Sequence, residues 1–296
     1  YDWANSAYAL TIMTAVLPVF YKEVAARDLA PHLSTAAWGY ANTAASLAVA
    51  LLAPVLGTIA DYRSYKKRFF AVFFALGVAA TAALATVGPG EWRWCLAVYI
   101  VSVIGFAGAN VFYDAFLVDV ATRERMDWIS SCGYAWGYFG STLPFMASLA
   151  FVLWNRRSAV LSSAGAVQAA FLVTAAWWAV FTIPFFRHVR QRYAIEPSPQ
   201  PVRDGLRRLA ATFAEVRRHR EAFVFLVAYF FYIDGVDTII RMAVVYGEDL
   251  GIGQSELLKI ILAVQFVAFP FALLAGKLAE RVPAKHLLLA GVAVYI

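Results

Sequence analysis

Residues 34–60 read STAAWGYANTAASLAVALLAPVLGTIA, an uninterrupted stretch without a charged side chain. A helix needs roughly 20 mostly apolar residues to cross the hydrocarbon core of a bilayer, and this stretch is longer than that. Lipid offers no hydrogen bonds to the backbone, so a spanning segment has to satisfy its own amide groups as a helix. The stretch therefore predicts a membrane-spanning α-helix.

More apolar runs of similar length lie on both sides of this stretch. They cover residues 3–21, 69–87, 94–118, 132–153, 160–186, 222–246 and 257–279, and a further run begins near residue 286. Of the 296 residues 62% are hydrophobic and 15% are charged, whereas soluble proteins are about 45–50% apolar and about 25% charged. We expect an all-α membrane protein with eight complete helices and the start of a ninth.

The longest break between these runs spans residues 187–221. It contains Glu196-Pro-Ser-Pro-Gln-Pro201, which cannot form a helix, followed by a basic amphipathic segment at residues 202–220. We expect this segment to be a helix on the inner headgroups, with a regulatory or partner-binding helix as the alternative. The predicted organisation is a six-helix half (1–186), a cytoplasmic linker (187–221) and an incomplete second half (222–296).

The basic residues divide unevenly between the two sides of the predicted membrane. Most of the 25 Lys and Arg residues lie in the connections that follow the second, fourth, sixth and eighth predicted helices. The few on the opposite side are Lys22, Arg27, Arg93, Arg156, Arg157 and Lys259. The excess of positive charge in cytoplasmic loops then places the N-terminus inside, and the pair Arg156-Arg157 is an exception that this rule does not explain. Because the net charge of +6 comes from these loops, we expect no nucleic-acid partner.

Sequence signatures of catalysis and of metal binding are absent. The sequence has no Gly-x-x-x-x-Gly-Lys phosphate loop, no His-Glu-x-x-His and no Gly-x-Ser-x-Gly elbow. Its two cysteines, Cys95 and Cys132, fall at opposite ends of their predicted helices, too far apart to pair. We expect neither an enzyme nor a cofactor.

A short pattern occurs twice, at the ends of the second and eighth predicted helices. Each copy has a glycine, an acid four residues later and nearby basic residues: Gly57, Asp61, Lys66, Lys67 and Arg68; Gly276, Glu280, Arg281 and Lys285. This recurrence on one side of the membrane indicates two repeated halves. We expect Gly57 to allow close helix packing and Asp61 to pair with a basic residue or with a helix N-terminus.

Polar residues at membrane depth gather on the first, fourth and seventh predicted helices. An ionisable residue at the centre of a bilayer costs at least ~2.5 kcal/mol, so each one is a candidate for function. The candidates are Asp2 and Asn5; Asn110 and Asp114; Asp234, Asp237 and Arg241. Their spacing places the last three on one helix face. We expect Arg241 to meet a carboxylate, and Asp234 to meet an ammonium group or a proton.

Each of these groups also has a structural interpretation. Asp237 and Arg241 can neutralise each other as a pair, and Asp2 can cap the first helix. Asp114 can serve in helix packing or in a gate, or it can carry a coupling proton. The residues alone leave these alternatives open.

The loop from Gly57 to Arg68 resembles the cytoplasmic loop signature of the major facilitator superfamily. Tyr62 and Ser64 depart from its usual basic residue and glycine, and in the second copy Pro283 replaces the glycine. In that superfamily the loop holds the cytoplasmic gate closed, and helices one, four and seven line the central cavity. The resemblance therefore implies that both copies form a cytoplasmic gate and that the polar candidates line a substrate site.

Four motifs resemble the vacuole effluxer family, which comprises fungal autophagy-related amino acid effluxers and their bacterial relatives. They are Tyr1-Asp-Trp-Ala-Asn-Ser-Ala-Tyr8, Asn110-Val-Phe-Tyr-Asp114-Ala-Phe-Leu, Ser130-Ser-Cys-Gly-Tyr-Ala-Trp-Gly-Tyr-Phe-Gly140 and Tyr232-Ile-Asp-Gly-Val-Asp-Thr-Ile-Ile240. The resemblance covers the whole chain. It implies the major facilitator fold of twelve helices, of which we expect this chain to hold about two thirds.

The resemblance also implies a function. We expect a monomeric secondary transporter that exports amino acids by alternating access and is coupled to protons, with the lipid bilayer and a small solute as its partners. The expected location is a bacterial inner membrane, or the vacuolar membrane if the protein is fungal. A lipid or drug exporter of the same fold, and a non-transporting membrane scaffold or receptor, are the alternatives.

Overall fold

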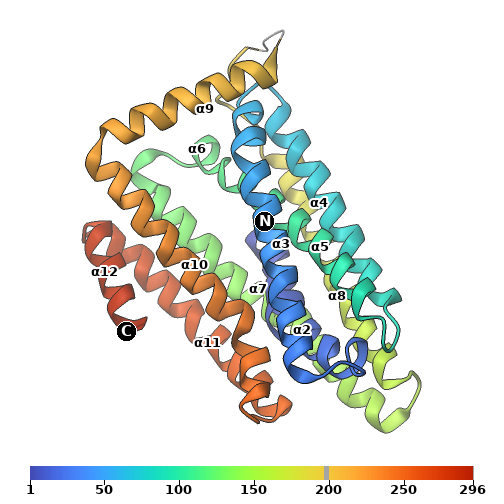
Figure 1. Ribbon diagram of the computed structural model, residues 1–296. Helices are drawn as coiled ribbons and strands as arrows, with labels where there is room; N and C mark the ends of the chain where they lie inside the picture. Colours follow the sequence, from blue (N-terminus) through green and yellow to red (C-terminus); the bar gives the residue numbers. More distant parts are fainter. Residues whose placement is uncertain (197–199, 296) are drawn as a thin grey trace.

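The computed structural model describes residues 1–196 and 200–295, and this part of the chain is built from helices without a strand (Figure 1). Among the described residues, eight helical segments are long and apolar enough to cross a membrane, as predicted. They are Asp2–Ala25, Pro31–Ala60, Tyr65–Thr86, Trp92–Val120, Arg123–Ser158, Ser163–His188, Arg220–Asp249 and Glu256–Ala279. Residues 197–199 of the predicted proline-rich break lie outside the described residues.

The first span is the most deeply buried and is not a regular α-helix. It consists of α1 (Asp2–Tyr8), the π-helix η1 (Ala9–Ala15), α2 (Val16–Phe20) and a second π-helix, η2 (Tyr21–Ala25). A π-helical turn widens the backbone by one residue and is rare, and it is found most often at functional sites. Hydrophobic periodicity cannot show such a change of pitch, so the sequence predicted only an apolar run here.

The first six spans form one bundle, in which the other five surround the first. The remaining helices of this bundle are α3 (Pro31–Ala60), α4 (Tyr65–Ala83), η3 (Leu84–Thr86), α5 (Trp92–Asp114), α6 (Leu117–Val120), η4 (Arg123–Arg125), α7 (Met126–Ser158) and α8 (Ser163–His188). Its largest cluster of buried side chains includes Tyr8, Trp38, Tyr99 and Trp178, each with no exposed surface. Aromatic residues of four different spans thus pack together in this cluster.

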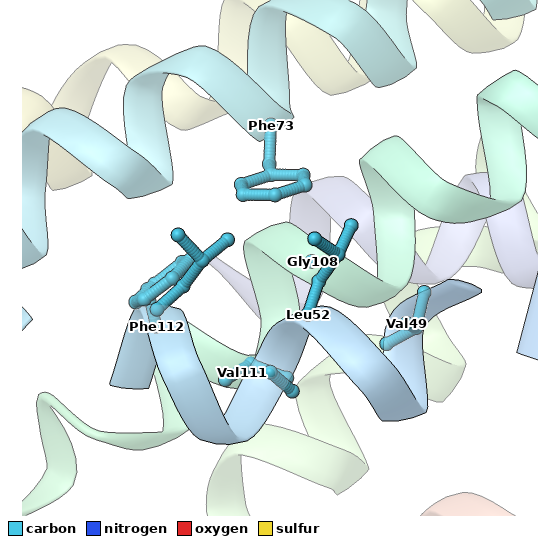
Figure 2. A pocket seen from close by; sticks show the side chains of 8 residues that line it. Val49, Leu52, Phe73, Gly108, Val111 and Phe112 are labelled. Atoms are coloured by element: carbon cyan, nitrogen blue, oxygen red, sulfur yellow. The ribbon is translucent and has the colours of Figure 1, made fainter. Parts of the chain in front are cut away.

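Small residues set the distances between the helices of this bundle. At Gly105 of α5, an added Cβ would overlap the backbone of Gly77 in α4, so only glycine lets these two backbones touch. Figure 2 shows the neighbouring layer, where the Phe73 ring lies over Gly108 and beside Leu52. The space left between α3, α4 and α5 is an apolar cavity of only about 10 Å³, enough for one water molecule at most.

The amphipathic segment forms α9 (Pro201–Arg218), which crosses one end of the molecule (Figure 1) and ends two residues before the expected limit of 220, since Arg220 already begins the next helix. We call this end the α9 face and the opposite end the far face. A guanidinium N–H of Arg208 donates to the Thr58 carbonyl over 3.3 Å, and the same group lies 4.9 Å from the Tyr62 ring. The helix is therefore attached to the end of α3.

The last helices are α10 (Arg220–Asp249), α11 (Gln254–Ala279) and α12 (Ala284–Tyr295), of which α12 is the predicted ninth run. α11 packs along α7, and a Cβ at Gly276 would come within 2.6 Å of the Ser131 Cβ. α10 buries Val244, Val245 and Gly247 near its C-terminal end, whereas most of its preceding residues are exposed. This helix is therefore held mainly at the far face.

Polar and apolar contacts close the far face. Asp249, the last residue of α10, forms an ion pair with Lys22 of the first span and accepts a hydrogen bond of 3.2 Å from the Thr35 hydroxyl of α3. Close to this pair along the first span and α10, Val19 and Val244 lie in one buried cluster with Leu257 of α11. The first span and α3 thus meet α10 and α11 at the far face through an ion pair, a hydrogen bond and a buried apolar cluster.

Candidate functional site

The first span and α5 share two hydrogen bonds between their predicted site residues. The Tyr113 hydroxyl donates to the Asp2 carboxylate over 2.7 Å, and the Asn5 amide donates to the Asn110 side-chain oxygen, also over 2.7 Å. Asn5 is buried, and its own side-chain oxygen accepts no hydrogen bond from any described residue. We call Asp2, Asn5, Asn110 and Tyr113 the α1–α5 polar cluster.

Aromatic residues and glycines fix the start of the first span around this cluster. The indole N–H of Trp178 in α8 donates to the Tyr1 hydroxyl over 3.1 Å, and the rings of Tyr1 and Tyr113 are 4.7 Å apart. On the other side, a Cβ at Gly137 of α7 would come within 3.4 Å of the Asp2 backbone. Asp2 lies inside the first turn of α1, which has no side-chain cap, so the capping interpretation is wrong.

A second polar group connects α10 to α3 and α5. Arg241 lies 3.2 Å from a carboxylate oxygen of Asp237, and its guanidinium donates to the side-chain oxygen of Asn42 over 3.5 Å. The Tyr99 hydroxyl donates to the same oxygen over 2.8 Å. The Arg241 side chain is only 13% exposed, and its Nε has no hydrogen-bond partner among the described residues. We call Asn42, Tyr99, Asp237 and Arg241 the Arg241 cluster.

The sequence predicted only part of this arrangement. The pairing of Asp237 with Arg241 was the structural alternative, and the structure contains that pair. Asp234 and Asp114 are exposed, and neither has a hydrogen bond or an ion pair to another described residue. Asn42 was missed, although an amide in the otherwise uncharged run 34–60 could have signalled it.

Some buried polar atoms outside both clusters have no hydrogen-bond partner among the described residues. Thr11, in the π-helix η1, is fully buried, and its hydroxyl has no hydrogen-bond partner within the described ranges. The side-chain oxygen of Gln265 in α11 is also a buried atom without a hydrogen-bond partner within the described ranges. Since η1 contacts α10, Thr11 belongs to the part of the first span that packs against α10. The sequence gives no pattern that distinguishes this threonine from others.

Two basic residues of the first loop pattern, Lys66 and Lys67, bind groups within the first six spans and at the end of α8. Lys66 is buried and forms an ion pair of 2.8 Å with Asp119, and it also donates to the Ala115 carbonyl over 2.9 Å. The ammonium group of Lys67 donates to the carbonyls of Phe186 and Val189 over 2.6 and 2.7 Å. Lys67 thereby satisfies backbone oxygens at the end of α8, where a positive charge is favourable.

Asp119 also holds the start of the predicted linker. Its second carboxylate oxygen accepts hydrogen bonds from the backbone N–H groups of Arg192 and Tyr193, over 2.8 and 2.9 Å. Next to it, the Ile195 N–H donates to the Asp61 carbonyl over 3.0 Å. The linker is therefore fastened to α6 through Asp119, which the sequence analysis missed, and to the loop between α3 and α4 through the backbone of Asp61.

The other residues of the two loop patterns make few contacts. An added Cβ at Gly57 would meet no described atom within 4 Å, so the expected close packing is found at Gly276 instead. Arg68 lies 5.8 Å from the Tyr65 ring. The remaining members are exposed and their side chains have no ion pair or hydrogen bond to a described residue: Asp61, Glu280, Arg281 and Lys285.

Comparison with known proteins identifies the family. The family described as "Vacuole effluxer Atg22 like" matches residues 32–125 and 118–296. A Bacillus subtilis (strain 168) protein named "Uncharacterized MFS-type transporter YxiO" is 49% identical over 298 residues, covering 100% of this chain and 70% of that protein. "Autophagy-related protein 22" of Yarrowia lipolytica (strain CLIB 122 / E 150) is 26% identical over 141 residues, covering 40% of this chain and 23% of that protein.

No solved structure matches the chain. The helical architecture and the similarity to an MFS-type transporter support the major facilitator fold that the sequence predicted. The chain belongs to the vacuole effluxer Atg22-like family of the major facilitator superfamily.

Proposed function

We propose that the protein exports amino acids by alternating access and works as a monomer. The observation that carries this proposal is the buried guanidinium of Arg241 inside a membrane span, with one N–H group that has no partner among the described residues. A buried cation is costly in a bilayer unless it is paired. A guanidinium also binds carboxylates through two parallel hydrogen bonds, which suits the carboxylate that all amino acids share.

The ammonium group of the same substrate requires acceptors. The exposed carboxylate of Asp234 and the unpartnered side-chain oxygens of Asn5 and Gln265 are acceptors that the described structure offers. We propose that substrate binds between the first span, α5, α10 and α11, with Arg241 on its carboxylate and these oxygens on its ammonium group. The two loop patterns form the cytoplasmic gate in this proposal, and the basic linker of residues 187–221 connects the two halves on that side.

Counterflow in proteoliposomes tests this function on the full-length protein. Vesicles loaded with one unlabelled amino acid should take up the same labelled amino acid transiently above equilibrium, and a panel of amino acids should show one preferred class. Counterflow needs only exchange, so an unknown coupling ion does not matter. If no amino acid exchanges while the purified protein is folded, amino acid export is wrong and lipid or drug export becomes the better proposal.

The same vesicles test proton coupling. We propose that Asp114 or Asp234 carries the proton, since both are acidic residues of spanning helices without a described partner. A pH gradient should then accelerate net transport, and the combination of Asp114→Asn with Asp234→Asn should remove the acceleration. An unchanged response to the gradient in that double variant would contradict proton transfer through these two residues.

A further inference from the structure

A second cavity lies toward the far face, away from both polar clusters. It has a volume of about 400 Å³, within the range of ligand pockets, and it lies between the first span, α7, α8 and α11. Its walls are mostly apolar, formed by side chains such as Val16, Phe20, Phe145, Leu149 and Leu262. None of the residues predicted to bind substrate lines it.

Charged residues line the same cavity on the side of the far face. Arg156, near the end of α7, and Lys259, in the second turn of α11, are both exposed, so the cavity reaches the surface. Neither forms an ion pair with a described residue, and the exposed Glu23 of η2 is the acidic residue of the lining. The mouth therefore carries one net positive charge above an apolar interior.

Two hydrogen bonds of the neighbouring Asn155 fix the backbone around Arg156. The Asn155 amide donates to the Leu161 carbonyl over 2.9 Å, and the Leu161 N–H donates back to the Asn155 side-chain oxygen over 2.8 Å. The Asn155 side chain is buried, and the chain turns at Ala159 with a φ of 51°. This closed loop fixes the last turn of α7 and with it the backbone position of Arg156, which lines the cavity.

We propose that this cavity binds a phospholipid, with one acyl chain between the apolar walls and the phosphate between Arg156 and Lys259. A phosphate diester carries one negative charge, which matches the net charge of the mouth. The mouth lies at the ends of spanning helices, which is the depth of lipid headgroups. A lipid held there would contact α7 and α11 together, the two helices that join the first six spans to the last ones.

This site gives a role to one member of the exceptional pair in the charge pattern. Basic residues on the side of the membrane opposite the cytoplasm are uncommon, and the pair Arg156-Arg157 is the exception there. Arg156 and Lys259 line the cavity, whereas Arg157 does not. The chain therefore offers a matched control, a neighbouring arginine in the same turn with no place in the site.

Native mass spectrometry of the full-length protein with added phosphatidylglycerol tests the headgroup contact. The combination of Arg156→Ala with Lys259→Ala should lower lipid retention by about 25-fold, because each of the two basic residues at a membrane surface contributes about a factor of five. Arg157→Ala should retain lipid like the unchanged protein. Equal retention in the double variant, or an equal loss in Arg157→Ala, would overturn the proposal.

A second pair of variants tests the acyl chain without touching the charges. Ser148 lines the cavity and is 3% exposed, and its hydroxyl has no partner among the described residues, so its removal breaks no hydrogen bond to them. Ser148→Leu fills part of the cavity and should reduce lipid retention as strongly as the charge variant, whereas Ser148→Ala should leave it unchanged. Full retention in a folded Ser148→Leu protein would show that no chain enters the cavity.

Discussion

Replacement of Arg241 by alanine should reduce amino acid counterflow on the order of 100-fold. A hydrogen bond to a charged group contributes about 1.5–3 kcal/mol, and every 1.4 kcal/mol is a factor of about ten. Alanine removes the two hydrogen bonds that we propose between Arg241 and a substrate carboxylate, and it also leaves Asp237 without its partner. Arg241→Lys keeps the charge but loses the planar guanidinium fork, so its counterflow rate should fall between those of the unchanged protein and Arg241→Ala. Initial rates with the preferred amino acid measure all three proteins.

Arg220→Ala is the matched control for this experiment. Arg220 is the first residue of α10, the helix that carries Arg241, and it is exposed. Its loss should leave the counterflow rate unchanged, because an exposed charge away from the site contributes little. Wild-type counterflow in Arg241→Ala would show that Arg241 has only the structural role of neutralising Asp237, and the proposed substrate contact would be wrong.

Replacement of Lys66 by alanine should cause a large loss of stability. The Lys66 and Asp119 side chains are 6% and 0% exposed, so the change leaves a buried carboxylate without its counter-ion. Such a change costs about 3–5 kcal/mol. The melting temperature of the purified protein in detergent should fall by on the order of 10 °C. The start of the linker should also loosen, since Asp119 holds the N–H groups of Arg192 and Tyr193.

Two comparisons make this result specific. Arg63→Ala removes an exposed cation from the same loop and should change the melting temperature little. The combination of Lys66→Met with Asp119→Leu removes both charges and should recover part of the loss, but not all of it, because two backbone N–H groups stay without an acceptor. A Lys66→Ala protein that melts like the unchanged one would show that the ion pair contributes nothing to the fold.

The sequence was sufficient to predict the number of spans. An apolar run of about 20 residues has one stable form in a bilayer, so composition and length alone decide it. The Asp237–Arg241 pair was foreseen for a similar reason, since residues four apart on a helix are neighbours whatever surrounds them. The spans, which the bilayer determines, and contacts within a single helix were therefore predictable.

Contacts between helices were not predictable in the same way. The partners of Arg241 and Lys66, which are Asn42 and Asp119, lie on other elements of the chain. Spacing along one helix does not say which neighbour a side chain will meet, and an uncharged amide or a single acid near a helix end gives no distinctive pattern. The π-helical turns around Thr11 were missed because apolar composition is the same in both helix types.

Alternating access requires the closed far face to open during transport. A disulfide between Val19→Cys and Val244→Cys tests this requirement directly. Both positions lie in the buried cluster near the Lys22–Asp249 pair, and the native Cys95 and Cys132 are replaced by alanine so that no other disulfide forms. Oxidation should stop counterflow, reduction should restore it, and each single-cysteine protein should exchange at the same rate under both conditions. Undiminished counterflow in the fully cross-linked protein would contradict transport through this gate.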